Sequence, residues 1–331
     1  MKISIAMTTY NGRAYIEKQI MSILKQTRKA DEIIICDDCS TDGTVDILKK
    51  ILEREKCDVF YLIENTVNQG YRKNFKKSIE LTSGELVFLC DQDDIWEPEK
   101  IEIVEKIFQE NENIYALNSA FTLIDGNDQV IPYKCRRGFY NHDQIRGRAK
   151  DNELVHIDYS MVLRYNISPG CTMAFRGSLK KQYVNYTKSI LPHDWEINLL
   201  AGMKNGCYFL NKSLIEYRIH GKNTLGMNTN DHLSALQFDN DIGFRISAIK
   251  EKKALIEMVD YWHERCRIDA RQLKQYNKIK KYDLLREEAV CQHKFSAWCR
   301  LLIMTCVLWD GKYVRFKSLF GDLFYVMKRG C

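Results

Sequence analysis

The stretch ELVFLCDQDDIWEP, residues 85–98, decides the fold prediction. Its apolar run, Leu86–Cys90, predicts a buried strand. Three carboxylates, Asp91, Asp93 and Asp94, follow that run directly. Like charges packed at a strand end repel one another, so a purely structural role for them costs stability. A divalent cation removes that cost, and such hard oxygen ligands suit Mg²⁺ or Mn²⁺ bound together with substrate phosphates. The alternative is a solvated acidic turn at the start of the next helix.

Strand and helix patterns alternate through the first 100 residues. Further apolar runs predict strands at 2–8, 32–36 and 59–63. Stripes with helical spacing lie between the strands: Ile16, Ile20, Ile23 and Leu24; Val45, Leu48, Ile51 and Leu52; Tyr71, Phe75 and Ile79. This alternation predicts an α/β fold whose parallel strands are covered by helices on both faces. Ligands bind such sheets at the carboxyl ends of the strands, where Thr8, Tyr10, Asp37, Asp38 and the acidic run are expected to converge.

Four ordered motifs give the pattern a family resemblance. They are TTYNG (8–12), DDCSTDGT (37–44), NQGYRKN (68–74) and CDQDDIWEPEKI (90–101). In this order and spacing they resemble the family 2 glycosyltransferases of GT-A fold. The resemblance is strong over residues 1–110 and continues more weakly to about residue 226 through SPGCTMAFRG, PHDWEI and YRIHGKNT. Within the family, DQDDIW followed by HDW and YRxHxxNT is most similar to bacterial rhamnosyltransferase-like enzymes that build surface polysaccharides.

The resemblance implies a fold and a division of the chain. The fold would be GT-A, a nucleotide-diphospho-sugar transferase with a Rossmann-like mixed sheet, spanning residues 1–230. A basic helical C-terminal region, 231–331, would follow it as an extension. The family's processive polymerases carry a QxxRW motif, which this sequence lacks, so processive synthesis is disfavoured.

The resemblance places the nucleotide-sugar donor on the N-terminal motifs. Asp37 or Asp38 matches the carboxylate that accepts a hydrogen bond from a pyrimidine imide N–H. Asp91 falls on the ribose side of the acidic motif. The other expected nucleotide-sugar contacts are Thr8, Thr9, Tyr10, Asn68, Asn74 and Gln92.

The resemblance also assigns the metal, the base and the acceptor side. Asp93 matches a metal ligand, and His220 matches a histidine that reaches the same ion, although a structural histidine is the alternative. Asp194 occupies the place of the catalytic base, but a helix N-cap would stand at the same position. Gly170 belongs to a loop near the acceptor, where the missing side chain allows close approach. Trp195 is expected on the same side.

Together these assignments predict an inverting glycosyltransferase that depends on Mn²⁺ or Mg²⁺. The cation neutralises the leaving diphosphate and the carboxylate deprotonates the acceptor hydroxyl. The expected donor is dTDP-rhamnose, with a UDP-hexose or UDP-N-acetylhexosamine as the alternative, and the expected acceptor is a growing lipid-linked surface glycan. Nucleotidyltransfer is disfavoured because no glycine-rich, lysine-bearing loop lies near residue 10. A non-catalytic sugar-binding protein has no need of Asp91, Asp93 and Asp194.

Cysteine usage indicates a reducing compartment. The 12 cysteines are scattered, and several, such as Cys36, Cys90 and Cys207, lie within apolar strands, which predicts free thiols in the cytoplasm. Cys36 and Cys39 form a CxxC, but no second pair completes a zinc site. The first residues enter a strand at once, so no secretory signal is predicted. We expect a cytoplasmic enzyme, or one peripheral on the inner face of the cell membrane.

The C-terminal region carries the net positive charge. Residues 245–331 contain 19 Lys and Arg against 10 Asp and Glu, whereas the first 244 residues contain 31 against 34. Its most apolar stretch, Phe295–Trp309, has 15 residues interrupted by Arg300, fewer than the roughly 20 that span a bilayer. Such a stretch suits an interfacial helix on anionic lipid, or equally a helix packed on the catalytic domain or a second subunit. No nucleic-acid motif accompanies the charge.

Overall fold

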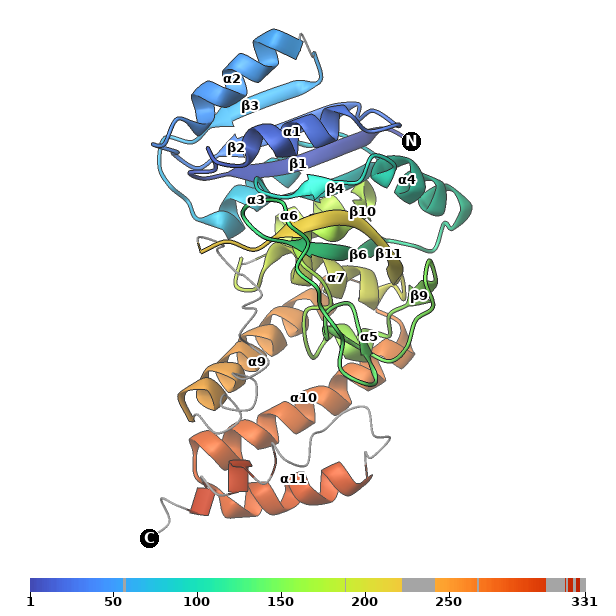
Figure 1. Cartoon of the computed structure of the whole chain (residues 1–331). Coiled ribbons are helices and arrows are strands. Elements are labelled where there is room, and N and C mark those ends of the chain that lie inside the picture. Colours follow the sequence, from blue (N-terminus) through green and yellow to red (C-terminus); the bar gives the residue numbers. More distant parts are fainter. Residues whose placement is uncertain are drawn as a thin grey trace. The chain divides into compact units, whose positions relative to one another are not determined.

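The computed structural model describes residues 1–55, 58–187, 189–221, 242–266, 268–307, 319, 321–323 and 326–327 (Figure 1). The chain divides into two compact units, Met1–Thr224 and Leu225–Cys331. The predicted domain boundary at residue 230 falls outside the described residues and stays a prediction.

The first four strands form the parallel half of the sheet, as predicted. They are β1 (Ile3–Thr9), β2 (Glu32–Asp37), β3 (Phe60–Glu64) and β4 (Leu86–Cys90), and they lie side by side in the order β3-β2-β1-β4. The helices α1 (Ile16–Leu24), α2 (Thr44–Glu55) and α3 (Tyr71–Leu81) alternate with them. The register sets Thr8 opposite Cys36 and Thr9 opposite Asp37. The ends of β1 and β2 are therefore level, and the motifs that follow them meet.

The second half makes the sheet mixed, as the resemblance implied. Strand β10 (Met173–Arg176) runs antiparallel to β4 on one side and to β6 (Ala116–Ile124) on the other. Strand β11 (Cys207–Arg218) runs parallel to β6 and pairs with the short β5 (Ile95–Trp96) and β9 (Leu154–His156). Because β5 directly follows the acidic run, its pairing with β11 brings the end of β11 to the carboxylates.

Helix α7 (His193–Met203) is the most deeply buried helix of this unit, since every one of its residues is buried. It contacts α3 and α6 (Lys180–Tyr186). Helices α1 and α2 contact each other. The N-terminal end of α7 carries the HDW motif. The sheet and α7 therefore both present predicted site residues from a rigid, packed setting.

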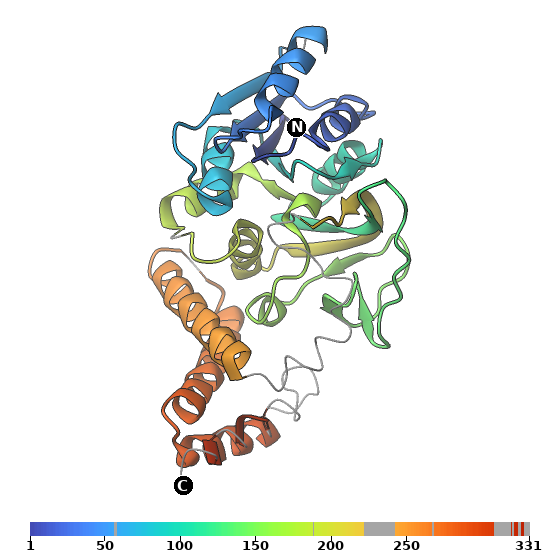
Figure 2. The ribbon, with the colours of Figure 1, turned by 60° about the vertical axis from the view of Figure 1, so that its left-hand side comes forward.

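The C-terminal unit is helical in its described part, in agreement with the predicted extension. It contains α9 (Ile242–His263), α10 (Ala270–Cys291) and α11 (Phe295–Val307), with α10 in contact with both of the others (Figures 1 and 2). One face of α11, including Trp298 and Leu301, is buried in a cluster with α10, while Phe295 and Ile303 are exposed. No helix among the described residues is both long and apolar enough to cross a membrane. Five of the basic residues of the C-terminal region lie outside the described part: Lys312, Arg315, Lys317, Lys328 and Arg329.

Candidate active site

Asp37 closes the turn after β2 with internal hydrogen bonds. The Thr9 hydroxyl donates to Asp37 Oδ2 at 2.7 Å, and Ser40 donates its backbone N–H to Oδ1 at 2.8 Å and its hydroxyl to Oδ2 at 2.6 Å. The residue is 1% exposed. Thr8, one position earlier, is also buried, whereas Tyr10 is 51% exposed. Of the residues predicted near the base at this strand end, Tyr10 is the one with an open side chain.

Asp38 holds the loop in front of α3. Its Oδ1 accepts hydrogen bonds from the amide of Asn65 (2.9 Å) and the backbone N–H of Gln69 (2.8 Å), and its Oδ2 accepts one from Gly70 (2.8 Å). The amide of Asn68 donates to the Asp38 carbonyl at 3.1 Å. Both motifs predicted to contact the nucleotide, 37–44 and 68–74, are thus joined through one carboxylate.

Asn74 lies beneath this surface. It is 1% exposed, donates to the Cys36 carbonyl at 2.8 Å, and accepts from the Asn65 amide at 2.9 Å. These bonds hold α3 against the end of β2. Its role as a nucleotide contact stays a prediction, and its observed contacts are structural.

Gln92 links the acidic turn to the loop after β1. Its Oε1 accepts the backbone N–H of Tyr10 at 2.8 Å, and its Nε2 donates to the Tyr10 carbonyl at 3.0 Å. Gly12 makes room for this pairing, because a Cβ there would lie 2.3 Å from Gln92 Oε1. The side chain predicted to contact the nucleotide-sugar therefore fixes the loop that carries Tyr10.

The two predicted metal ligands lie together. His220 Nε2 is 2.8 Å from Asp93 Oδ2, and the side chains are each 14% exposed. Two neighbouring ligand atoms at about 2.1 Å from an octahedral ion are roughly 3 Å apart, so the observed separation suits one shared ion. A carboxylate and an imidazole are ligands that Mn²⁺ accepts. The residues present therefore fit the predicted cation.

Arg218 orders the acidic turn from the end of β11. Its side chain is fully buried, and its Nε donates to the Asp93 carbonyl at 2.7 Å. Its backbone N–H donates to Asp94 Oδ1 at 3.0 Å. Its Nη1 donates to the Asp125 carbonyl at 2.9 Å and forms an ion pair with Asp128 at 2.5 Å. The guanidinium thus fixes the backbone that presents Asp93. Arg218 itself lies two residues before His220.

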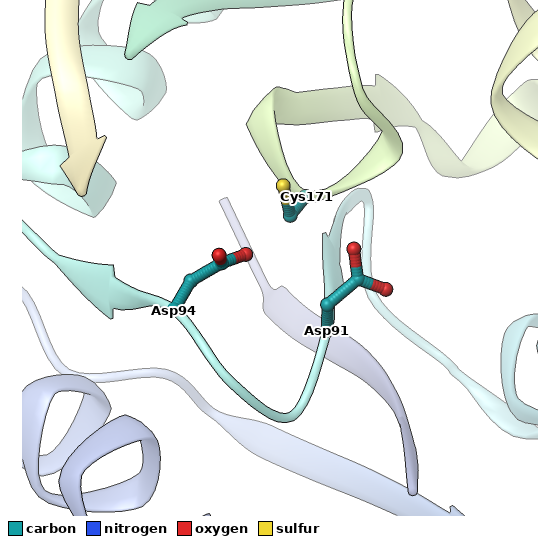
Figure 3. A group of neighbouring side chains, drawn as sticks. All are labelled: Asp91, Asp94 and Cys171. Atoms are coloured by element: carbon teal, nitrogen blue, oxygen red, sulfur yellow. The ribbon is translucent and has the colours of Figure 1, made fainter. Parts of the chain in front are cut away.

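The two carboxylates on either side of the Gln92–Asp93 pair form a second acidic cluster, with Cys171 (Figure 3). Asp91, Asp94 and Cys171 each offer a ligand atom within 4.8 Å of the others. Burial and the charge of Asp93 raise the pKa of Asp94 to about 7. Burial also raises the pKa of the Cys171 thiol, which keeps it protonated. With Asp94 engaged by the β11 backbone, this cluster suits a cation less well than Asp93 and His220 do.

Lys100 provides a second buried positive charge in this region, beside Arg218. Its Nζ donates to the Cys171 carbonyl at 2.7 Å and lies 4.1 Å from the centre of the Trp96 ring. Burial lowers the pKa of Lys100 to about 8. The ammonium group tethers the loop that contains Gly170 to the start of α4 (Lys100–Glu110).

Asp194 stands in the first turn of α7 and is 5% exposed. Pro192 holds the N-cap position and no side chain caps this helix, so Asp194 is not the N-cap residue. The Asn166 amide donates to its Oδ2 at 2.7 Å, whereas Oδ1 has no hydrogen bond of normal geometry among the described residues. Burial raises the pKa of Asp194 to about 6, against the opposing effect of Asn166 and of backbone N–H groups at the helix start.

His193 and Gly170 are packed against each other beside Asp194. A Cβ on Gly170 would lie 2.8 Å from His193 Nε2 and 3.4 Å from Asp194 Cβ. The His193 ring stacks on Phe75 with centroids 3.7 Å apart. The missing side chain of Gly170 thus leaves room for His193, and close approach of an acceptor to this loop stays a prediction. Trp195, predicted on the acceptor side, is 5% exposed and donates its indole N–H to the Val162 carbonyl at 2.6 Å, which fixes α7 in place.

Three residues that hold the predicted site residues in place were not themselves predicted. Arg218 stands in the quoted YRxH pattern, so its position was visible but its contacts were not. Asn166 precedes the SPGC loop by two residues and has no signal of its own. Lys100 is a lysine in the first turn of a helix, a place where a solvated side chain is the usual expectation. Each acts through a contact between residues far apart in the sequence.

The sequence matches the family model described as "Glycosyl transferase family 2" over residues 4–179. The dTDP-rhamnosyl transferase RfbG of Shigella flexneri is 28% identical over 243 residues, which are 67% of this chain and 74% of that protein. The UDP-Glc:alpha-D-GlcNAc-diphosphoundecaprenol beta-1,3-glucosyltransferase WfgD of Escherichia coli is 31% identical over 128 residues, which are 39% of this chain and 50% of that protein.

Solved structures share the fold. The structure of S. aureus TarS 1–349 in complex with UDP superposes with a TM-score of 0.58 at 16% identity, covering 100% of this chain and 92% of that one. The mannosyltransferase PcManGT from Pyrobaculum calidifontis, in complex with GDP-Man and Mn²⁺, gives a TM-score of 0.51 at 14% identity, covering 99% and 86%. At these identities the likeness is evidence of fold alone.

Proposed function

The chain belongs to glycosyl transferase family 2 and has the predicted GT-A fold, and from this premise we propose that it is an inverting, metal-dependent enzyme. It moves one sugar from a nucleotide-sugar to a growing surface polysaccharide. That it is a glycosyltransferase follows from the family match and from its relatives. The metal, the stereochemistry and the substrates are the proposed part.

One observation carries the proposal: Asp194 and the carboxylates of the acidic turn lie near enough for their charges to interact, and their surroundings differ. Asp93 lies beside His220, and Asp194 lies beside the loop that contains Gly170. Burial, then the charges of Asp94, Asp93 and Asp194, raise the pKa of Asp91. The charge of Asp194 thus acts on the acidic turn, which supports a base located near a donor held at that turn.

The residues divide the chemistry between them. A divalent cation held by Asp93 and His220 would neutralise the leaving diphosphate as a Lewis acid. Asp194 takes the proton of the acceptor hydroxyl on Oδ1, the oxygen without a normal hydrogen bond. Asn166 holds the other oxygen and so fixes the direction of the carboxylate. Attack by the acceptor on the anomeric carbon, opposite the leaving group, inverts that centre with one base.

The proposed donor is dTDP-rhamnose. It is supported by the similarity to a dTDP-rhamnosyl transferase across two thirds of the chain. A UDP-hexose or UDP-N-acetylhexosamine is the second candidate, supported by the similarity to a UDP-Glc-dependent enzyme over a shorter segment. That relative also acts on a sugar linked to diphosphoundecaprenol, which supports a lipid-linked acceptor here.

Screening nucleotide-sugars with and without Mn²⁺ tests the proposal. We expect dTDP-rhamnose to bind more tightly than UDP-glucose, UDP-N-acetylglucosamine and GDP-mannose, and to be hydrolysed slowly when no acceptor is present. EDTA should remove hydrolysis, and Mn²⁺ should restore it. Full activity in EDTA would contradict the role of the cation, and preference for a UDP-sugar would replace the donor.

Association with the inner face of the membrane belongs to the same proposal. Residues 291–331 carry seven Lys and Arg against two Asp, and each basic side chain near an anionic surface contributes about 1 kcal/mol. We expect the full chain to co-sediment with anionic liposomes and to be released by high salt. A chain ending at Gln292 should remain soluble and bind donor without sedimenting. Because α11 also packs on α10, unfolding of the shortened chain would favour a structural role for this segment.

A further inference from the structure

A basic hairpin stands out within the otherwise acidic first unit. We define it as residues 131–150, which contain six Lys and Arg and one acidic residue, Asp143. Residues 1–224 contain 31 Lys and Arg and 31 Asp and Glu in total, so outside the hairpin 25 basic residues face 30 acidic ones. The six basic residues are all exposed: Lys134, Arg136, Arg137, Arg146, Arg148 and Lys150. The hairpin is therefore a local concentration of positive charge.

The hairpin brings three of its arginines to one end. Strands β7 (Phe139–Tyr140) and β8 (Ile145–Arg146) pair antiparallel, and Gly147 donates its N–H to the Gly138 carbonyl at 2.9 Å. These contacts bring the two arms together beyond the ladder. Arg137 on one arm, and Arg146 and Arg148 on the other, therefore lie at the open end. Figure 2 shows the green segment between β6 and β9 extending away from the central sheet.

The turn of the hairpin is held in an unusual conformation. Asn141, His142 and Asp143 have φ values of 49°, 54° and 66°, a region that non-glycine residues adopt at an energetic cost. His142 stacks on Phe121 with centroids 4.2 Å apart. Asp143 accepts hydrogen bonds from Arg136, through the backbone N–H at 2.7 Å and through Nε at 2.8 Å. These contacts hold the turn in one conformation and so restrain the position of the two arms of the hairpin.

The hairpin is tied to the acceptor side of the site. The buried amide of Asn141 donates to the Ile167 carbonyl at 2.9 Å and contacts the Ser168 hydroxyl at 3.3 Å. Ile167 and Ser168 directly precede the loop that packs Gly170 against Asp194. The donor motifs lie instead at the ends of β1, β2 and β4. A substrate held by the hairpin is therefore on the acceptor side.

Within the described part of the chain, Arg136 is paired with Asp143 at 2.8 Å, but no carboxylate pairs with Arg137, Arg146 or Arg148. Like charges gathered at one end of a hairpin repel one another, so their common partner should be an anion. Guanidinium groups match phosphate oxygens with paired hydrogen bonds. The hairpin has no large exposed apolar side chain, although the adjoining Val130 is exposed, so it is not built to enter a lipid bilayer.

We propose that the basic hairpin binds the diphosphate group of the acceptor through Arg137, Arg146 and Arg148. This rests on the proposed function, because it requires an acceptor that carries its sugar on a diphosphate. The hairpin would hold that group while the glycan end reaches Asp194. The donor diphosphate, by contrast, belongs to the side of Asp93 and His220.

Binding of phenoxyundecyl diphosphate to the full chain tests this, with phenoxyundecyl monophosphate and phenoxyundecanol for comparison. The variant Arg137→Gln/Arg146→Gln/Arg148→Gln removes three exposed charges. A matched control, Lys25→Gln/Lys50→Gln/Lys106→Gln, removes three exposed charges elsewhere in the first unit. We expect the hairpin variant to bind the diphosphate at least about tenfold more weakly and the control to stay within about twofold of wild type. Thermal unfolding verifies that both remain folded.

Three results would overturn the proposal. The hairpin variant could keep the wild-type affinity for the diphosphate. The control could lose as much affinity as the variant, which would reduce the effect to net charge. The variant could lose binding to phosphatidylglycerol vesicles while it keeps the diphosphate, which would make the hairpin a membrane contact. Binding of dTDP-rhamnose and UDP-glucose, measured on the same proteins, reports separately on the proposed function. If the wild-type protein binds neither donor, the proposed transferase function is contradicted, while the diphosphate test of the hairpin still stands.

Discussion

The buried carboxylates at the end of β2 accept hydrogen bonds with both of their oxygens, whereas the buried carboxylate of Asp194 at the start of α7 does not. Asp37 and Asp38 each accept three hydrogen bonds from neighbouring loops. Asp194 has an oxygen without a normal hydrogen bond, and both ring nitrogens of His193 lack a partner within the described residues. Both regions are buried, so exposure does not explain the difference.

The difference suits two roles: some carboxylates hold loops in place, and another is left able to contact a substrate. Carboxylates that accept several hydrogen bonds hold loops in one conformation, which prepares a binding surface at no further cost when the ligand arrives. A buried oxygen without a hydrogen bond costs stability in the free protein, and such a group calls for an explanation. A substrate hydroxyl would supply the missing partner. The contrast therefore supports the proposed division, in which Asp37 and Asp38 hold the loops that would bind the nucleotide and Asp194 would act on the acceptor.

The largest effect on activity is expected at the acidic turn, where the proposed cation would bind. Asp93→Asn should lower transfer by about 10³-fold or more, because the leaving diphosphate loses its charge neutralisation. The fold should be retained, since Arg218 contacts the backbone carbonyl of Asp93 and not its carboxylate. Activity is measured with Mn²⁺ in excess, beside thermal unfolding. A variant with near-normal turnover would remove Asp93 from the metal site.

Asp194→Asn is expected to lower turnover by at least about 10²-fold with donor affinity nearly unchanged. The base acts in its ionised form, so wild-type turnover should fall as the pH drops below about 6, the raised pKa of Asp194. The folded-state pKa lies above the unfolded value of about 3.9, so the folded chain holds an extra proton between these pH values. The free energy of unfolding should therefore fall as the pH rises from 4 to 6.

The same variant should be more stable than wild type at pH 7. The ionised carboxylate costs up to about 3 kcal/mol for a two-unit pKa shift, and asparagine avoids this cost while it still accepts from Asn166. Chemical denaturation at pH 7 measures the difference. A variant that is less stable and fully active would mean that the α7 side, like the β2 side, is structural.

Gln92→Met is expected to weaken donor binding by about tenfold, because the loop that carries Tyr10 loses two hydrogen bonds of about 1 kcal/mol each. Gly12→Ala should act in the same direction, since its Cβ would displace the Gln92 amide. Donor titration of the two variants gives the comparison. If only Gln92→Met weakens binding, the side chain contacts the donor directly.

Asn74→Ala should have the smallest effect on substrate binding and a clear effect on stability. It removes the hydrogen bond to the Cys36 carbonyl and leaves one of the two Asn65 amide N–H groups without its buried acceptor, while Asp38 keeps the other, a loss of about 1–3 kcal/mol in the free energy of unfolding. Donor affinity should change by less than about threefold in the folded protein. Lost donor affinity at unchanged stability would place Asn74 in the pocket and break the contrast between the two sides.

The sequence by itself determined the strands and helices of the first 100 residues and the family. Apolar runs and helical stripes are local signals, and the order of four motifs needs no coordinates. Local signals also placed Asp93 directly after a strand and Asp194 at a helix start. They left open whether Asp194 caps its helix, because aspartate is common at helix N-caps and also serves as a catalytic base.

Only the tertiary structure decided which of these residues meet. His220 comes within 2.8 Å of Asp93 because β11 pairs with β5, a contact between residues 127 positions apart. It also showed that Pro192, and not Asp194, holds the N-cap position, and that Asn74 and Trp195 make buried hydrogen bonds within the protein. The buried roles of Arg218, Lys100 and Asn166 depend on partners that are remote in the sequence. Hydrogen bonding and burial of this kind are properties of the folded chain, so no local pattern contains them.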